Sequence, residues 1–366
     1  MKILLVSSQW SETRKTGLGF ASSIHKEILE SIGFKVITVG NINDKTDYEF
    51  KNSGRVDLLI KYFKLSNFIK DIIIREKPDF VFVESLQNIF SEISIIVAKK
   101  LKKNIVLISH GISIFPYKLN FKYILRFLFW IPYIFFIIFV LKKVNIFLNF
   151  DNCSKNLRHF DLFIYKNILR KKKCYEINNF SRFERSNNLM TSHHQSKNKI
   201  ILSFGYLNHI KNQLDILKIA NEIRDINIIF RIVYSEYSLN YLKKLKNYIE
   251  EKKMKNIELI NSQETDLNEE IKNCYFFINT SITEVMPLTI FEAMEKGKIY
   301  LSYDVGSVSK IPEVIVNNNI KQMTANIKSL LKNESLVLNS SINLQKNYYK
   351  KYSITQLKKR LKEIFC

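Results

Sequence analysis

The stretch TSITEVMPLTIFEAMEKG, residues 280–297, is the most informative part of the chain. An apolar run, Tyr275–Ile278, comes just before it and predicts a buried strand. Pro287 stands where a helix would begin, and Gly297 stands where that helix would end. The stretch therefore predicts a strand, a loop and a helix in succession, which is the repeating unit of a parallel α/β sheet.

Two glutamates in this stretch are separated by seven residues. Glu284 falls in the predicted loop, and Glu292 falls inside the predicted helix. In open α/β sheets, ligands bind beyond the carboxyl ends of the strands. The loop is therefore in the right place for a ligand, and its two carboxylates can accept hydrogen bonds from ligand hydroxyls.

Strand and helix patterns alternate along the rest of the chain, which predicts the α/β class with parallel sheets. Apolar runs predict further strands at Ile3–Ser7, Lys35–Val39, Phe80–Val83, Ile105–Ser109, Val144–Leu148, Ile200–Phe204, Ile228–Val233, Ile257–Ile260 and Ile299–Ser302. Helical patterns between them include Phe20–Ser31, Ser91–Lys102, Gln213–Ile223 and Leu239–Lys252.

A chain of 366 residues is long enough for two domains. Residues 182–199 are polar and rich in Ser and Asn, which is typical of a linker. We therefore expect one domain over residues 1–181 and a second over residues 200–345. The terminal segment 346–366 contains an amphipathic helix, predicted over Tyr352–Phe365.

The chain carries 57 Lys and Arg against 34 Asp and Glu, so its net charge is 57 − 34 = +23. Such an excess indicates a polyanionic partner, either nucleic acid or an anionic membrane. An alternative source is genome composition, since Lys, Asn, Ile, Phe and Tyr all have A/T-rich codons. No nucleic-acid module or basic–aromatic repeat is recognisable, so we expect no nucleic-acid partner.

The four cysteines, at 153, 174, 274 and 366, are widely spaced, which argues against a disulfide scaffold or a structural zinc site. The pattern suits a reducing cytoplasm. The apolar run Met1–Val6 is too short for a signal peptide and predicts a first buried strand. There is no Asp-x-Asp motif, and His193-His194 has no acidic or Cys neighbours. We therefore expect a cytoplasmic protein without a metal or other cofactor.

With Pro287, the Glu-Ala-Met triplet and Gly297 in place, the stretch 280–297 resembles the Glu-x7-Glu signature of glycosyltransferase family 4. These are retaining enzymes with the GT-B fold, in which two Rossmann-like domains with parallel sheets face a central cleft. The resemblance is strongest from about Leu202 to Glu313. It implies an acceptor-side N-terminal domain, a C-terminal domain that binds a nucleotide sugar, and a last helix that crosses back to the first domain.

The resemblance also implies roles for individual residues. Glu292 matches the glutamate that binds the nucleotide ribose, and Glu284 matches the one that faces the donor sugar. Lys211 matches a lysine that binds the donor diphosphate. Further matches are a phosphate-approaching turn, a His-Gly pair near the donor sugar and a glycine-rich N-terminal loop; they fall on Gly306 and Ser307, on His110 with Gly111, and on Gly17 and Gly19.

Three positions depart from the family's pattern. Tyr206 stands where arginine is usual in the diphosphate segment, so half of that cationic clamp is missing. Val285 replaces the glycine that usually follows the first glutamate, and Ser307 replaces the second glycine of a Gly-Gly pair. These departures keep open the alternative of a catalytically degenerate scaffold in a glycan assembly complex. A sugar-nucleotide epimerase is a second alternative on the same architecture, although its signature differs.

An uncharged apolar run covers Phe127–Leu141, with Lys or Arg on both sides. As a helix it would measure roughly 22 Å, short of the ~30 Å hydrocarbon core of a bilayer. We expect either a monotopic patch that docks on an anionic inner leaflet or a core helix under the first sheet. Docking would fit a lipid-linked acceptor. The resulting prediction is a retaining, metal-independent hexosyltransferase that uses a nucleotide sugar and builds surface polysaccharide of the capsule, O-antigen or lipopolysaccharide type.

Overall fold

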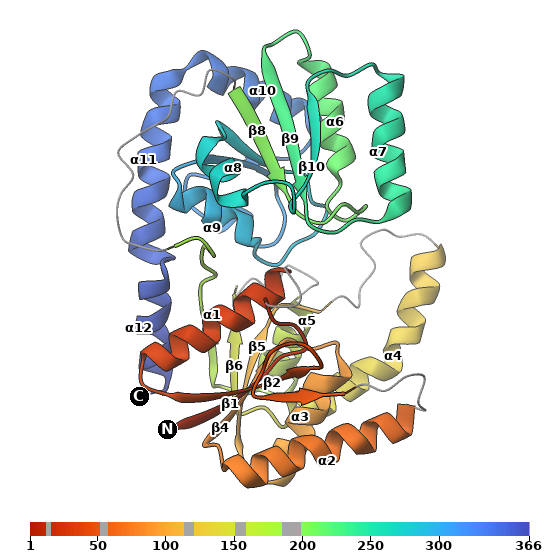
Figure 1. The fold of residues 1–366 in the computed structure, drawn as a ribbon, viewed down its shortest axis with the longest axis vertical. Coiled ribbons are helices and arrows are strands. Elements are labelled where there is room, and N and C mark those ends of the chain that lie inside the picture. The colour runs from red at the N-terminus through yellow and green to blue at the C-terminus, as the bar shows by residue number, and fades with distance from the viewer. Residues whose placement is uncertain (12–15, 52–57, 113–120, 151–158, 185–198, 366) are drawn as a thin grey trace. The chain divides into compact units, whose positions relative to one another are not determined.

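The structure is a computed structural model that describes residues 1–365 apart from 12–15, 52–57, 113–120, 151–158 and 185–198. The chain forms two compact units (Figure 1). The first contains Met1–Asn178 and the chain from Leu357 on, and the second contains Asn179–Gln356. Each unit has one sheet, and all pairings among the described strands are parallel. The predicted α/β class with two Rossmann-like domains is confirmed.

The first unit has the strand order β3-β2-β1-β4-β5-β6-β7. Its strands are β1 (Lys2–Val6), β2 (Lys35–Asn41), β3 (Tyr48–Phe50), β4 (Phe80–Glu84), β5 (Asn104–Ser109), β6 (Ile146–Asn149) and β7 (Cys174–Glu176). Its helices are α1 (Gly17–Ser31), α2 (Leu58–Glu76), α3 (Ile89–Lys100), α4 (Phe121–Leu141), α5 (Phe160–Phe163), the π-helical η2 (Ile164–Ile168) and most of α12 (Ile354–Phe365).

The second unit has the strand order β10-β9-β8-β11-β12-β13. Its strands are β8 (Lys199–Phe204), β9 (Ile228–Tyr234), β10 (Ile257–Asn261), β11 (Phe276–Asn279), β12 (Ile299–Tyr303) and β13 (Ile315–Asn317). Its helices are α6 (Gln213–Glu222), α7 (Leu239–Glu251), α8 (Leu267–Asn273), α9 (Leu288–Glu295), the 3₁₀ turn η3 (Val308–Lys310), α10 (Ile320–Lys332) and α11 (Glu334–Lys351).

Both sheets are doubly wound, and the winding reverses beside the first strand of each unit. Connections lead one way from β1 through β2 to β3 and the other way from β4 to β7. The same reversal separates β8 from β11. Loops on either side of such a switch point diverge at the carboxyl ends of the strands, which leaves room for a ligand. The central strands are buried on both faces, which explains their continuous apolar sequences: Ile3, Leu4, Leu5 and Val6 have no exposed surface.

Every strand predicted from an apolar run is present, with ends shifted by at most two residues. The strands missed were β3, β7 and β13, which have three residues each and are too short to show a pattern. The predicted glycine-rich loop was wrong: Gly17 and Gly19 do not form a loop but belong to the first turn of α1. The helix begins there because Thr16 caps it, accepting a hydrogen bond at Oγ1 from the Gly19 N–H at 3.1 Å.

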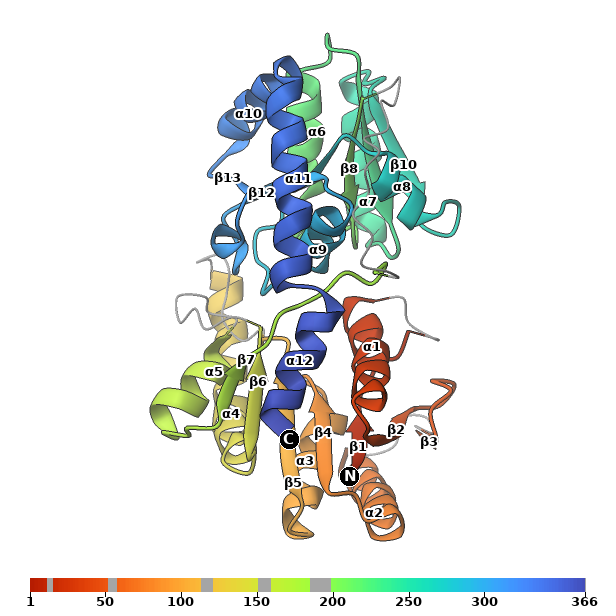
Figure 2. The same cartoon turned by 90° about the vertical axis from the view of Figure 1, so that its left-hand side faces the viewer.

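The segment 179–184 packs within the second unit. The Ser181 hydroxyl donates to Glu295 of α9 at 2.9 Å, and the Ser181 N–H donates to the hydroxyl of Tyr348 on α11 at 3.0 Å. At the other end of the chain, α12 runs down to the C-terminus within the first unit (Figure 2). The ring of its residue Phe365 contacts Phe34, Phe80 and Phe82. The chain therefore passes between the units at 178–179 and again at 356–357, whereas the linker was predicted at 182–199.

The described side chains of α4, from Trp130 on, divide into two faces. Ile137, Val140 and Leu141 are buried in the core of the first unit. Phe135 and Phe139 are 69% and 50% exposed, and Ile131 lies one turn before them on the same exposed stripe. The helix is therefore core on one side and open on the other. Among the residues that the structure describes, no helix has the length and apolar content to span a bilayer.

Candidate active site

The switch point of the second unit brings together two loops that carry predicted site residues. The loop after β8 and the loop after β11 are bonded to each other: the Ile282 N–H donates to the Ile210 carbonyl at 2.7 Å, and the Thr280 hydroxyl donates to the Asn212 carbonyl at 2.9 Å. Across this contact the Lys211 ammonium lies 2.5 Å from Glu284 Oε1. Lys211 and Glu284 are 73 residues apart in the sequence, and these two predicted site residues form one ion pair.

The loop that carries Lys211 is shaped by its own sequence. Asn208 Oδ1 accepts hydrogen bonds from the Ile210 and Lys211 N–H groups, both at 2.9 Å. These hydrogen bonds close a turn of the kind that asparagine favours, and Lys211 lies at its end, just before α6 begins. The side chain of Lys211 is 33% exposed and that of Glu284 is 12% exposed. Both side chains are therefore accessible to a ligand. The ammonium can bind an anionic group of the ligand, and the carboxylate can accept a hydrogen bond from a ligand hydroxyl.

The turn after β12 supports the backbone that carries Glu284. The Ser307 N–H and hydroxyl donate to the Val285 carbonyl at 3.0 and 3.2 Å. Gly306 has φ +60°, and a Cβ there would lie 2.2 Å from the Val285 oxygen and 2.7 Å from the Glu284 oxygen. Glycine is required here because the chain leaves no space for a side chain. Gly306 thus lies close against the protein's own backbone, and its predicted approach to a phosphate stays a prediction.

Val285 fits this loop without the glycine that the resembled family has there. It is not among the described residues with a positive φ, so a β-branched residue meets no backbone penalty at this position. Its side chain is buried. Valine at this position therefore causes no backbone strain in the Glu284 loop.

Glu292 lies on the buried side of α9, where Arg182 covers it. Arg182 Nε and Nη2 donate to the two carboxylate oxygens at 2.5 and 3.1 Å. The Glu292 side chain has no exposed surface, and that of Arg182 is 8% exposed. Both glutamates of the motif are thus paired with a cation, one with a lysine from the loop after β8 and one with an arginine from the segment before β8.

In the first unit, the predicted residue His110 follows β5 and pairs with a buried glutamate at the end of β4. Glu84 accepts a hydrogen bond from His110 Nε2 at 2.9 Å and, on its other oxygen, from His25 Nδ1 of α1 at 2.7 Å. Burial alone would raise the pKa of Glu84, but the charge of His25 and the hydrogen bonds from both imidazoles hold the pKa at about 2. The carboxylate therefore orients His110, whose ring also packs on Phe150.

We expect Glu84→Gln to destabilise the protein by about 3 kcal/mol at neutral pH, because losing one charged partner of a buried, hydrogen-bonded pair costs about that much. Because the folded pKa is lowered, the stabilisation is present above pH 4.5 and is lost as the pH falls towards 2. Urea unfolding of both proteins at several pH values between these limits and neutrality measures the difference. The surface variant Glu30→Gln controls for the loss of one carboxylate. A destabilisation that stays constant with pH would contradict the assignment.

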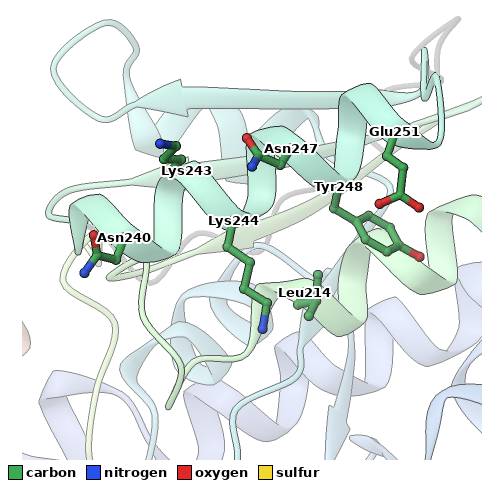
Figure 3. A pocket seen from close by; sticks show the side chains of 7 residues that line it. All are labelled: Leu214, Asn240, Lys243, Lys244, Asn247, Tyr248 and Glu251. Atoms are coloured by element: carbon green, nitrogen blue, oxygen red, sulfur yellow. The ribbon is translucent and has the colours of Figure 1, made fainter.

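A groove of about 430 Å³ lies elsewhere on the second unit, between α6 and α7 (Figure 3). It is lined by Leu214, Asn240, Lys243, Lys244, Asn247, Tyr248 and Glu251, and Lys244 and Tyr248 point from α7 towards α6. None of Lys211, Glu284 or Glu292 lines it. The groove is therefore separate from the candidate site.

Three residues of these arrangements, His25, Glu84 and Arg182, were not predicted from the sequence. Glu84 ends the apolar run FVFVE, and a carboxylate at the carboxyl end of a predicted parallel strand was a usable signal. Arg182 carried no such signal, because it stands in a polar segment whose composition is typical of a linker.

Comparison with known proteins agrees with this architecture. Residues 185–351 match the family model described as glycosyl transferases group 1. No curated protein sequence matches the chain. Among solved structures, a glycosyltransferase from Rickettsia africae superposes with a TM-score of 0.73 at 15% identity, covering 99% of this chain and 97% of the other. The UDP and glucose complex of Anabaena HepE gives 0.74 at 13% identity, covering 99% and 98%.

A third solved structure, the lipopolysaccharide outer core galactosyltransferase WaaB, gives a TM-score of 0.64 at 14% identity and covers 100% of this chain and 99% of the other. The chain therefore has the GT-B fold of these solved glycosyltransferases. The part of the chain that matches the glycosyl transferases group 1 model, residues 185–351, falls within the second unit.

Proposed function

We propose that the protein is a retaining glycosyltransferase of family 4 that moves a hexose from a nucleotide sugar to a glycan or lipid-linked acceptor of a surface polysaccharide. The observation that carries this proposal is the Lys211–Glu284 pair at the switch point of a group 1 domain. Lys211 binds the donor diphosphate, and Glu284 accepts hydrogen bonds from the donor sugar. Cationic side chains compensate the diphosphate charge, so catalysis does not depend on a bound metal.

The reaction we propose proceeds on one face of the sugar. The bond from the anomeric carbon to the diphosphate breaks, and the leaving diphosphate takes the proton of the acceptor hydroxyl as the new glycosidic bond forms on the same face. No protein nucleophile is needed, and Glu284 stabilises the charge that develops on the sugar. His110, oriented by Glu84, belongs to the same proposal as a residue of the first unit that contacts the donor sugar.

The choice of product is supported by the solved structures of similar fold. One of them transfers galactose in the lipopolysaccharide outer core, and another binds UDP and glucose. Capsule, O-antigen and lipopolysaccharide outer core share the chemistry of sugar addition to a growing, membrane-linked glycan. We infer that this chain acts at the cytoplasmic face of the membrane on such an acceptor.

A thermal-shift panel of UDP, GDP, ADP and their sugar conjugates tests the proposal. A ligand that binds only the folded protein raises the melting temperature by mass action. We expect one nucleotide to raise it, and the same nucleotide's sugar conjugate to be consumed with retention of the anomeric configuration. No shift with any nucleotide would favour the degenerate scaffold. Consumption to an epimer without an acceptor would favour the epimerase.

Membrane docking through α4 is the second part of this proposal. The exposed stripe contains Ile131, Phe135 and Phe139, and the helix is followed by Lys142 and Lys143. The Lys143 ammonium lies 3.3 Å from the centre of the Phe139 ring, so a cation stands directly at the end of the apolar stripe. Exposed aromatic rings next to lysines suit the boundary between acyl chains and anionic headgroups.

We expect Phe135→Ser with Phe139→Ser to lower binding to phosphatidylglycerol-containing vesicles about 10-fold or more, because each half-exposed ring contributes about 1 kcal/mol when it is buried in the bilayer. Flotation with and without the anionic lipid measures this binding. Phe63→Ser, which removes an equally exposed ring from α2 of the same unit, is the matched control and should change nothing. Wild-type protein that never floats would overturn the docking proposal, whereas a self-association lost in the double variant would assign the face to a second copy.

A further inference from the structure

Arg182 lies near the proposed donor site of the second unit but does not belong to the loops after β8 and β11 that form this site. The residue belongs to the segment before β8, yet its guanidinium carbon lies 4.8 Å from the centre of the Phe204 ring at the carboxyl end of that strand. Hydrogen bonds of the preceding residue, Ser181, to Glu295 and to Tyr348 fix this segment on α9 and α11. Arg182 is therefore held in place by the fold.

Glu292 orients the guanidinium group. Its two oxygens accept one hydrogen bond each from Arg182 Nε and Nη2, which is the two-point geometry that fixes the plane of the group. The Glu292 side chain has no exposed surface, and the Arg182 side chain is 8% exposed. The ion pair thus holds the guanidinium plane fixed beside the carboxyl end of β8.

The loop after β8, residues 205–212, has one lysine and no arginine. It provides Lys211, but its other candidate position is Tyr206, two residues after Phe204. A nucleotide diphosphate carries more charge than one ammonium balances, and a planar guanidinium binds phosphate oxygens in pairs. A buried arginine–glutamate pair is weak evidence of a purely stabilising role, because desolvation offsets much of its attraction.

We propose that Arg182 supplies the second cation for the donor diphosphate and that Glu292 is a positioning residue that acts through it. This inference rests on the proposed function, since it assigns a residue of the same donor site. Arg182 thereby supplies the positive charge that Tyr206, which stands where arginine is usual, does not provide. The competing assignment is that Glu292 binds the ribose. In that case Arg182→Gln would weaken a nucleoside and its diphosphate equally, whereas our assignment predicts that only the diphosphate is weakened.

The test compares a nucleoside diphosphate with its nucleoside by calorimetric titration, using whichever of UDP, GDP and ADP binds the wild-type protein. We expect Arg182→Gln to weaken the diphosphate about 10- to 100-fold, as for loss of a charge-assisted hydrogen bond, and to leave the nucleoside unchanged. Adding Tyr206→Arg to this variant should recover most of the loss. Arg231→Gln, which removes an arginine that bridges Glu258 and Glu270 in the same unit, should change neither affinity.

Equal weakening of the nucleoside and the diphosphate would overturn the inference in favour of ribose recognition through Glu292. An unchanged diphosphate affinity would overturn it as well. If Arg182→Gln does not fold, because Glu292 is left buried and charged, the double variant Arg182→Gln with Glu292→Gln replaces the ion pair by two neutral amides, and the same comparison applies. A wild-type protein that binds no nucleotide would instead refute the proposed function.

Discussion

Lys211→Met is expected to weaken binding of the donor nucleoside diphosphate about 100- to 1000-fold and to lower kcat/KM by a similar factor, because it removes a preorganised cation from the developing charge of the leaving group. The fold should persist. The Lys211 side chain is one-third exposed, and partly exposed ion pairs contribute little to stability. Calorimetric titration, initial rates and a melting temperature measure the three quantities.

The partner residue separates binding from catalysis. Glu284→Gln removes a negative charge beside the phosphate site, so we expect the affinity for the diphosphate to stay the same or rise while kcat falls. Lys218→Met is the matched control, because Lys218 forms a similar pair, 2.9 Å from Asp215, on α6. If Lys211→Met behaves like Lys218→Met, the pair at the switch point is a surface feature and the donor site lies elsewhere.

Gly306→Ala is expected to destabilise the second unit by about 3 kcal/mol and to abolish transfer. Its Cβ would lie 2.2 Å from the Val285 carbonyl oxygen, so the loop that carries Glu284 must move. Inserting a methyl group into a packed region costs about 1–3 kcal/mol, and the left-handed backbone adds about 1 kcal/mol for a residue with a Cβ. Urea unfolding and single-turnover rates measure the two effects.

Gly297→Ala isolates the contribution of the contact. Gly297 has φ +62° in the same unit, nearly the same as Gly306, but the nearest atom to its Cβ would be the Ser341 oxygen at 3.2 Å. The backbone cost is therefore equal, and the steric cost is much smaller. We expect Gly297→Ala to retain transfer activity. Equal losses in the two variants would show that backbone conformation alone, and not support of the Glu284 loop, requires glycine at position 306.

The apolar runs of the sequence are enough to predict two parallel sheets, because strands buried on both faces must be apolar at successive positions, as Ile3 to Val6 are. The spacing of Pro287, Glu292 and Gly297 likewise predicts where a strand is followed by a loop and a helix. These features depend on neighbouring residues, so a local pattern contains them. The motif could also be placed at the carboxyl end of a strand, which is where Glu284 lies.

Pairing between distant residues depended on the tertiary structure. Arg182 and Glu292 are 110 residues apart, and Glu84 lies between two histidines because β4 is next to both β1 and β5. Strand order is set by how whole helices pack across the sheet, and no local pattern contains it. The same reason applies to α4. An apolar run does not show which of its side chains are buried, as Ile137 is, and which remain exposed, as Phe135 does.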